Sequence, residues 1–323
     1  MARASLTAGF PNYNHSRYLP QAIEAILGQS RQPDEFIIVD DASTDNSVEI
    51  IQSYARQHPV LRLVQNERNL GAAASLRLLQ TTAVSDYLYQ GAADDYVLPG
   101  FFEQAMALAE RYPEAGVIMG KVVVVDANDE GLAVAGIRRW REPLYASPER
   151  FLREYLNVEY VEHSLTSATI YRWAALAEIG YFRPELGYWT DTFAIRALAL
   201  KYGACYSPEP WATWRVFAES FGSQYYHNLE ARLALADTIS TLMRTPEFAD
   251  RFPESYARTW RRDLRLKVLD DYIWRLREPL GRSAWGMLQG RLLKRLLGLQ
   301  VALQYHGDVA AFIRDHQARH PKD

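Results

Sequence analysis

Short apolar runs alternate with amphipathic segments over roughly the first 120 residues. Continuous apolar runs are typical of strands buried on both faces, whereas apolar residues three or four apart are typical of helices. The alternation predicts an α/β fold with a mostly parallel sheet, right-handed crossovers and helices on both faces. The expected strands are 5–10, 36–39, 61–64, 86–89 and 116–125, and the expected helices are 16–29, 45–56, 71–81 and 99–111.

The pattern changes twice further along the chain. Residues 127–180 are less regular, with a helical segment at 148–156 and a strand at 167–171 that leads into a helix ending near Gly180. From about residue 231 the chain is rich in Leu and Arg and has few strand signals. We therefore expect a catalytic domain at 1–230 and an α-helical extension at 231–323.

Composition narrows the class of protein. The chain has 323 residues, is 48% hydrophobic and carries a formal net charge of −3, so no global charge points to nucleic acid. The single cysteine, Cys205, excludes an internal disulfide. We find neither a signal-peptide pattern nor an apolar run of about 18 residues, and we expect a cytoplasmic protein.

Two double aspartates stand directly after expected strands. Asp40–Asp41 follows the run at 36–39, and Asp94–Asp95 follows the strand that begins near residue 86. Ligands of open α/β sheets bind at the carboxyl ends of strands. Adjacent carboxylates repel each other unless a cation or several hydrogen-bond donors lie beside them. The pattern therefore suits a site for a nucleotide, a sugar and a divalent metal.

Each motif also has a simpler interpretation. Residues 11–14 can form a turn, Ser43 and Asp45 can cap a helix, and Asp94–Asp95 can be solvated turn acids before the next helix. Capping does not account for the two adjacent acids at 40–41.

Taken together, the segments resemble family 2 glycosyltransferases with the GT-A fold. The resemblance covers about residues 3–225 and implies a nucleotide-diphosphate-sugar donor and an inverting transfer. It is carried by residues 11–14, 18–19, 22–29, 39–45, 66–71, 94–95 and 99–100.

The resemblance implies roles for individual residues. Tyr13 and Asp41 would hold the nucleobase, with Pro11 in the same wall. Asp94 would contact the ribose, and Asp95 would bind the divalent metal, Mn²⁺ or Mg²⁺.

The same resemblance implies a general base. Members of the family carry a carboxylate just before a helix, and Asp191 matches this position before the helical run that ends near Lys201. Its alternative role is that of a helix N-cap.

Three positions depart from the family pattern. Ala92 stands where the first acid of a D-x-D triplet is usual, and Leu76–Arg77 replaces an Arg-Asn pair. Phe217 stands where a late histidine would provide a further metal ligand, and His227 is a weak substitute. These departures motivate a second hypothesis, a catalytically weak protein that binds a nucleotide or glycan.

The acceptor side is poorly specified. Several aromatic or imidazole side chains suit either a sugar-stacking surface or the core. They are Trp140, Tyr160, His163, Trp189 and Trp211, of which His163 and Trp189 are our candidates for the acceptor.

Leucines and basic residues are interspersed at 291–303. Such a helix can lie on an anionic membrane surface, pack on the catalytic domain or form a homodimer. Peripheral contact with the inner membrane face is therefore one possible setting.

We expect an inverting glycosyltransferase that uses a UDP- or dTDP-sugar and a glycan, lipid-linked or small-molecule acceptor. Other nucleotide-binding enzymes fit less well. Neither G-x-G-x-x-G nor G-x-x-x-x-G-K-[ST] follows a strand, which disfavours dinucleotide and P-loop enzymes.

Overall fold

The computed structural model describes residues 3–157, 165–216 and 228–277, with backbone alone for 270–277. The chain divides into two compact units. One comprises Met1–Ser223 and Pro246–Phe252, and the other comprises Gln224–Thr245 and Pro253–Asp323. The expected boundary near residue 231 stays a prediction.

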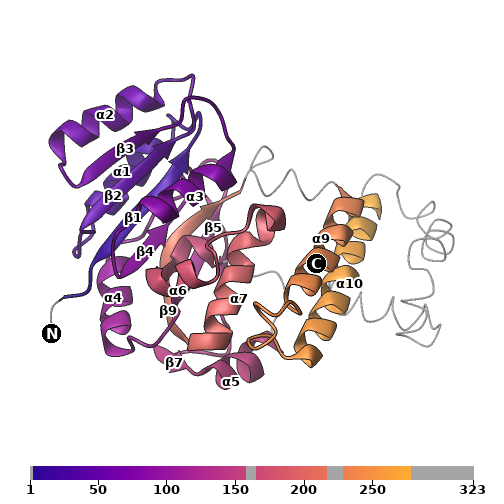
Figure 1. Ribbon diagram of the computed structural model, residues 1–323. Helices are drawn as coiled ribbons and strands as arrows, with labels where there is room; N and C mark the ends of the chain where they lie inside the picture. Colours follow the sequence, from indigo (N-terminus) through magenta and orange to yellow (C-terminus); the bar gives the residue numbers. More distant parts are fainter. Residues whose placement is uncertain (1–2, 158–164, 217–227, 278–323) are drawn as a thin grey trace. The chain divides into compact units, whose positions relative to one another are not determined.

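The first part of the chain has the predicted alternation of strands and helices (Figure 1). Element ends differ from the expected ones by a few residues. The elements are β1 (Leu6–Asn12), α1 (Leu19–Leu27), β2 (Glu35–Asp40), α2 (Ser47–Gln57), β3 (Leu61–Gln65), α3 (Ala72–Thr82), β4 (Tyr87–Gln90) and α4 (Phe101–Arg111).

The later part of the first unit contains strands that the apolar pattern did not predict. They are β6 (Gly131–Ala135), β7 (Leu144–Ala146) and the long β9 (Ala204–Arg215). The remaining elements are β5 (Val117–Val125), α5 (Pro148–Phe151) continued by a π-helical turn (Leu152–Leu156), a 3₁₀ turn (Thr166–Ala168), β8 (Thr169–Arg172), α6 (Trp173–Glu178), a second 3₁₀ turn (Pro184–Trp189) and α7 (Thr190–Tyr202).

The strands form one mixed sheet in the order β3-β2-β1-β4-β8-β5-β9-β7, with β6 paired to β5. The pairs among β1 to β4 are parallel, whereas β8 is antiparallel to both β4 and β5. The chain runs outward from β1 to β3 and then returns to place β4 on the other side of β1. This reversal creates a topological switch point between β1 and β4, where ligands of such sheets bind.

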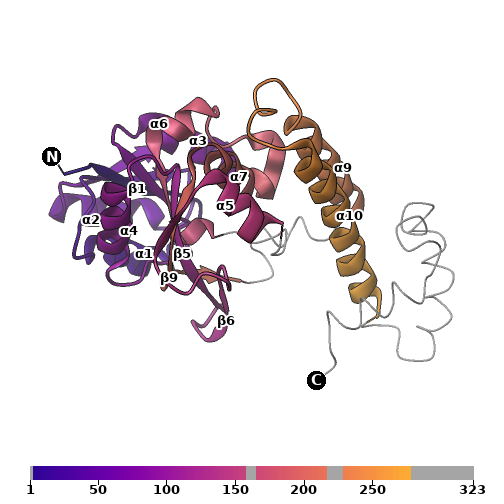
Figure 2. The ribbon, with the colours of Figure 1, turned by 90° about the horizontal axis from the view of Figure 1, so that it is seen from below.

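Helices cover both faces of the sheet, as Figures 1 and 2 show. Helices α1, α2 and α4 lie on one face, and α3, α5, α6 and α7 lie on the other. The fold is therefore the predicted α/β arrangement, although the antiparallel β8 makes its sheet mixed.

Gly9 on β1 lies where the neighbouring atoms leave no room for a side chain. A methyl group on Gly9 would lie 2.4 Å from the carbonyl oxygen of Ile37 and 2.6 Å from a methyl carbon of Leu79. Gly9 thus permits the close approach of β2 and α3 to β1. Its carbonyl also accepts a hydrogen bond from Gly91 N, which ties β1 to the segment after β4.

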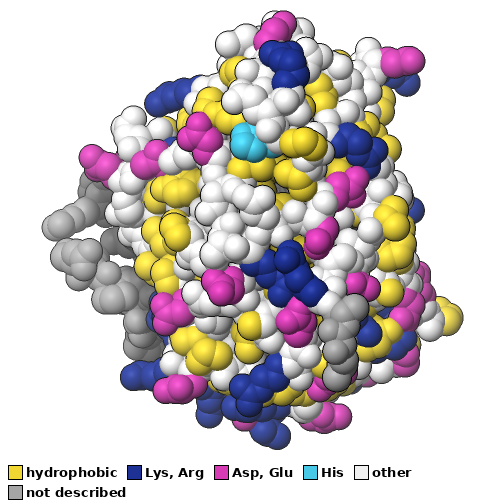
Figure 3. All heavy atoms as spheres, turned by 90° about the vertical axis from the view of Figure 1, so that its left-hand side faces the viewer, with side chains coloured by type: hydrophobic (Ala, Val, Ile, Leu, Met, Phe, Trp, Pro, Cys, Tyr) yellow, Lys and Arg dark blue, Asp and Glu magenta, His cyan; other side chains and the backbone are white. Residues whose placement is uncertain are grey.

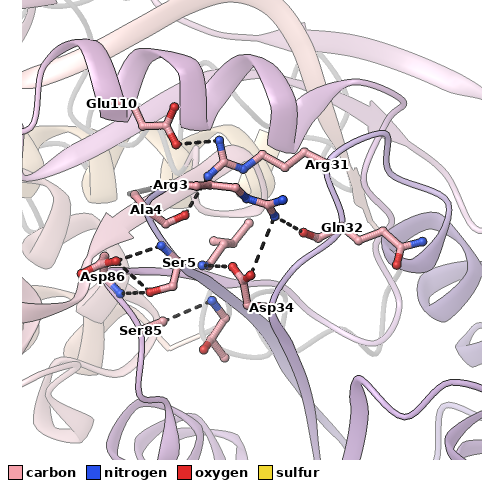
Figure 4. A network of polar contacts seen from close by, with 11 residues as sticks. Arg3, Ala4, Ser5, Arg31, Gln32, Asp34, Ser85, Asp86 and Glu110 are labelled. Atoms are coloured by element: carbon pink, nitrogen blue, oxygen red, sulfur yellow. Dashed lines mark hydrogen bonds and ion pairs between the residues drawn. The ribbon is translucent and has the colours of Figure 1, made fainter. Parts of the chain in front are cut away.

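Polar contacts hold the opposite edge of the sheet, where the parallel strands begin (Figure 4). The carboxylate of Asp86 accepts hydrogen bonds from the amide and hydroxyl of Ser5, both at 2.8 Å. Asp34 accepts from Leu6 N at 2.8 Å, and Arg31 forms an ion pair with Glu110. This edge is therefore occupied by internal contacts, while the carboxyl edge carries the polar motifs.

The second unit contains two packed helices, α9 (Leu229–Leu242) and α10 (Glu254–Arg277). Asn228 caps α9 by accepting a hydrogen bond from Ala231 N at 2.9 Å. Asp237 on α9 accepts hydrogen bonds from Arg261 and Arg265 on α10. The described part of the predicted extension is thus helical. The basic segment at 291–303 lies outside the described residues.

None of the helices within the described ranges is both long and apolar enough to cross a membrane. On the face shown in Figure 3, acidic, basic and hydrophobic side chains are interspersed.

We predict that Gly9→Ala destabilises the first unit by about 1–3 kcal/mol, because the neighbouring backbone oxygen cannot move without breaking the sheet. The measurement is urea unfolding followed by tryptophan fluorescence. Gly131→Ala is the matched control, since an added methyl group meets nothing within 4 Å there. Equal stability of the two variants would contradict the packing argument.

Candidate active site

The turns after β1 and β2 are joined by hydrogen bonds. The amide of Asn12 donates to Asp40 Oδ2 at 2.8 Å, and the Ser43 hydroxyl donates to the same oxygen at 2.6 Å. Asp40 is fully buried, and the Ser43 backbone amide donates to its other oxygen. Asp40 therefore stabilises the turn that positions its neighbour, Asp41.

Asp41 holds the loop that leads into α3. Its Oδ1 accepts hydrogen bonds from Asn66 Nδ2 at 2.7 Å and Leu70 N at 2.9 Å, and its Oδ2 accepts one from Gly71 N at 2.8 Å. A carboxylate has about four acceptor positions, so three internal donors leave about one for a further N–H group. The predicted nucleobase contact of Asp41 stays a prediction.

Tyr13 projects from the turn after β1. It is 42% exposed, and the next residue, Asn14, has a left-handed backbone with φ of 57°. The Asn14 side chain accepts a hydrogen bond from Thr44 N at 2.8 Å, which fixes this turn against the one after β2. Pro11 lies on β1 in register with Val39. An exposed ring on a fixed turn has the geometry of a stacking platform.

The second aspartate pair lies in the loop after β4. Asp95 is buried, and its carboxylate accepts hydrogen bonds from Arg215 N and the Ser167 hydroxyl, both at 2.7 Å. Burial, followed by the charge of Asp94, raises the pKa of Asp95 well above its ordinary value. Burial also raises the pKa of Asp94. A cation would reduce the cost of keeping both groups ionised.

Arg215 was not among the predicted site residues, yet it links the segments around this loop. Its side chain is 1% exposed and donates hydrogen bonds to the carbonyl of Asp94 at 2.8 Å and to Gln21 Oε1 at 3.0 Å. It also pairs with Asp129 at 2.8 Å and lies 4.7 Å from the ring centre of Tyr18.

The signal for Arg215 in the sequence was weak. The residue ends β9, a strand that the apolar pattern did not reveal. Its partners come from α1, from the loop after β4 and from the turn between β5 and β6, segments that only the fold brings together.

Consecutive residues of one 3₁₀ turn connect the two predicted reactive carboxylates. Ser167 donates to Asp95 Oδ2, and Thr166 donates to Asp191 Oδ2 at 2.5 Å. Neither residue was predicted, because a single Thr-Ser pair carries no distinctive pattern. The structure thus brings Asp95 and Asp191 to opposite sides of the same short segment.

Asp191 lies in the first turn of α7, which begins at Thr190, whereas the sequence pattern placed this residue just before the helix. Its Oδ1 accepts a hydrogen bond from Thr192 N at 2.5 Å, while Thr166 donates to Oδ2. Trp189, the residue before α7, makes no side-chain cap, and the helix begins at Thr190, so Asp191 is not its N-cap residue. A carboxylate held by both oxygens in this way has a defined direction, which a proton acceptor requires.

The residues around Asp94 and Asp95 fit a divalent cation bound together with a substrate. Mn²⁺ and Mg²⁺ prefer oxygen ligands and often combine one or two carboxylates with phosphate oxygens. No cluster of three or more His, Cys, Asp or Glu side chains suited to a metal occurs in the described part of the chain. A cation here would therefore depend on oxygens from the substrate.

Some of the residues proposed to bind the acceptor lie outside the described residues, and others are buried. His163 and Tyr160 lie outside the described residues, as do Phe217 and His227. Trp189 is 2% exposed and lies against the Arg196 guanidinium, so the predicted acceptor contact stays a prediction. Trp211 packs on Phe101 in the core, with ring centres 4.9 Å apart.

The sheet is mixed and has a switch point beside β1. An exposed aromatic residue follows β1, and two acids follow β4. This arrangement is that of GT-A-like α/β proteins. Residues 7–166 match the family model described as glycosyl transferase family 2. Over this segment, which is about half of the chain, the protein is similar to glycosyl transferase family 2.

Curated relatives match the same part of the chain. EpsE of Bacillus subtilis is 36% identical over 115 residues, which cover 35% of this chain and 41% of EpsE. The glycosyltransferase GlyG of Streptococcus pneumoniae is 33% identical over 119 residues, which cover 37% of this chain and 39% of GlyG. The matches thus span about two fifths of these relatives.

Solved structures share the fold over more of the chain. TarS of S. aureus in complex with UDP-GlcNAc has a TM-score of 0.66 at 18% identity and covers 90% of this chain and 81% of its own. The mannosyltransferase PcManGT of Pyrobaculum calidifontis, in complex with GDP-Man and Mn²⁺, has a TM-score of 0.58 at 17% identity. It covers 100% of this chain and 89% of its own. These similarities establish the fold.

We predict that Arg215→Met lowers the free energy of unfolding by about 1.5–3 kcal/mol, because it removes the charged hydrogen bonds of a buried guanidinium to Asp94 O, Gln21 and Asp129. Arg215→Lys should recover only part of the loss, since an ammonium group cannot reproduce the fork of a guanidinium. Urea unfolding measures both.

Arg62→Met is the control, because Arg62 pairs with Glu35 at the surface, where side-chain exposures are 48% and 31%. Its effect should be below about 1 kcal/mol. An Arg215→Met protein as stable as this control would contradict the assigned role of Arg215.

Proposed function

We propose that the protein is an inverting glycosyltransferase that moves a sugar from a nucleotide-diphosphate donor to a hydroxyl group of an acceptor. The observation that carries the proposal is the Thr166–Ser167 turn, which contacts Asp191 on one side and Asp95 on the other. This turn links the proposed proton acceptor to the buried Asp95. The match of residues 7–166 to the glycosyl transferase family 2 model supports the same reaction.

The donor would occupy the switch point between β1 and β4. Tyr13 offers an exposed ring for the base, and Asp41 retains room to accept one more N–H group. Uracil and thymine each present one imide N–H, which favours a UDP- or dTDP-sugar. Asp94 would contact the ribose, and Pro11 would complete the wall around the base.

Asp94 and Asp95 would hold a divalent cation together with the donor diphosphate. When bound, Mn²⁺ or Mg²⁺ supplies positive charge that stabilises the leaving diphosphate. The buried guanidinium of Arg215 provides a further positive charge beside this loop.

Asp191 would act as the general base. One of its oxygens accepts the proton of the acceptor hydroxyl while the hydroxyl oxygen bonds to the anomeric carbon. The bond from that carbon to the diphosphate oxygen breaks at the same time, so the nucleoside diphosphate leaves and the anomeric configuration inverts. The transition state resembles an oxocarbenium ion. A glycan, a lipid-linked sugar or a small molecule would supply the hydroxyl group.

The alternative is a family member that binds a nucleotide or glycan with little turnover, motivated by Ala92 at the usual position of an acid. The orientation of Asp191 by two hydrogen bonds favours catalysis instead. Contact with a membrane and dimerisation through the C-terminal segment remain separate proposals.

We predict metal-dependent binding of UDP or dTDP, with weaker binding of GDP. Calorimetric titration of the three nucleotides, with and without Mn²⁺, measures this. Asp95→Asn should remove most of the increase in affinity caused by Mn²⁺, because it removes one charge from the proposed metal site. Binding that is identical with and without Mn²⁺ would refute the metal role of Asp95, and a failure of every nucleotide to bind would refute the donor site.

We predict that Asp191→Asn lowers turnover by about 10²–10⁴-fold while nucleotide affinity stays unchanged, since the amide cannot accept the proton. The assay is release of nucleoside diphosphate from UDP-, dTDP- and GDP-sugars, with sugar acceptors or water. Asp86→Asn is a matched control at the opposite end of β4. Undiminished turnover by Asp191→Asn would rule out this residue as the base.

A further inference from the structure

Three polar side chains are buried on neighbouring elements of the first unit. They are Gln80 on α3, Gln90 at the end of β4 and Tyr171 on β8, each at most 1% exposed. A polar group in the core is costly unless it is hydrogen-bonded. Their positions on neighbouring elements suggest one connected arrangement.

The direction of the hydrogen bonds follows from one backbone group. Phe182 N–H can only donate, and it lies 3.1 Å from Gln80 Oε1, which must therefore accept. The amide nitrogen of Gln80 then donates to Gln90 Oε1 at 2.7 Å. This leaves the amide nitrogen of Gln90 as a donor directed away from Gln80.

The next group is the hydroxyl of Tyr171. Burial raises the pKa of Tyr171 well above its ordinary value, and the charge of Asp191 raises it further. Hydrogen-bonding interactions with Thr166 and Gln90 act in the opposite direction, so both side chains lie beside the hydroxyl. Tyr171 therefore stays neutral and can donate one hydrogen bond.

Two buried atoms need a partner at this point. Among the described residues, neither the Gln90 amide nitrogen nor the Tyr171 hydroxyl makes a hydrogen bond of good geometry. A small side-chain shift would let the Gln90 nitrogen donate to the Tyr171 oxygen. The Tyr171 hydroxyl would in turn donate to Thr166 Oγ1, whose own hydrogen is directed to Asp191.

We propose that Gln80, Gln90, Tyr171 and Thr166 form a one-directional hydrogen-bond relay that positions Asp191 for its role as general base. Every group in the relay donates toward the carboxylate, which accepts only. Successive hydrogen bonds of the same direction polarise and strengthen one another. The relay fixes Oδ2, while Thr192 N fixes Oδ1.

The residues of the relay are positioning residues, since Asp191 alone would contact the acceptor. The inference rests on the proposed function, because these residues affect turnover only if Asp191 is the general base. It adds that turnover depends on the buried Tyr171 and on the half-buried Thr166, neither of which would contact the acceptor.

The test compares variants of the full chain that remove one hydroxyl each. Thr166→Val should lower turnover by about 10–100-fold, because small errors in the position of a reacting group have effects of this size. Tyr171→Phe should lower it by about 3–10-fold, since Thr166 remains, and Thr166→Ser should restore turnover to within about threefold. UDP affinity, measured by calorimetry, should stay unchanged in all three.

Two matched controls lose a buried hydroxyl away from Asp191. Thr7→Val removes a hydroxyl on β1 that donates to Glu35 Oε2, and Tyr87→Phe removes one that donates to Ala109 O. Both should turn over UDP-sugars at the wild-type rate. Equal losses in the controls and in Thr166→Val, or weakened UDP binding in Thr166→Val, would show that the hydroxyls serve the fold alone and would overturn the relay.

Crystal structures of Thr166→Val and Tyr171→Phe separate the relay from the proposed function. We expect the Asp191 carboxylate to rotate from its position in the unmodified protein. An unmoved carboxylate with wild-type turnover would overturn the relay even if Asp191→Asn is inactive. If Asp191→Asn is fully active, the proposed base fails, and the position of the carboxylate in the two crystal structures still decides whether the relay orients it.

Discussion

The burial of the Asp95 carboxylate is the constraint on which the arrangement of the site depends. A charged group in the core must be matched by donors or by a cation. The amide of Arg215 at the end of β9 and the hydroxyl of Ser167, in the turn just before the antiparallel strand β8, both donate to this carboxylate. Strands far apart in the sequence must therefore meet at the loop after β4, which fixes the edge of the sheet where a substrate would bind.

The acids at this edge have different roles because their partners differ. Asp40 is fully buried and holds a turn, whereas Asp41 holds a loop and keeps room for one more donor. Asp95 stabilises the contact with Arg215, and Asp191 is directed by a threonine and a backbone amide. Residues with structural roles thus lie next to residues with proposed chemical roles. A substitution of one acid therefore affects both the fold of the loop and the geometry of the site.

The parallel half of the sheet was predictable because its signals are local. Buried strands such as β2 are continuous apolar runs, and the amphipathic helices between them carry their own spacing. The positions of Asp41 and Asp94 at strand ends follow from the same pattern. In contrast, β9 contains polar and aromatic residues in mixed order and alternates between buried and exposed positions only in part. Its pairing with β5 is therefore not visible in its own residues.

The sequence by itself determined the α/β class, the alternation of the first strands and helices, and the placement of the two aspartate pairs at the ends of strands. It placed Asp191 before a helix, and the structure has this residue in the first turn of α7. Tertiary structure alone decided that Arg215 lies against Asp94 and Asp95, and that Thr166 and Ser167 connect Asp95 to Asp191. The physical reason is that periodicity reports burial within one element. Hydrogen bonds between distant residues, such as Asp95 and Arg215, which are 120 positions apart, depend on how the strands pair, and no local pattern records that pairing.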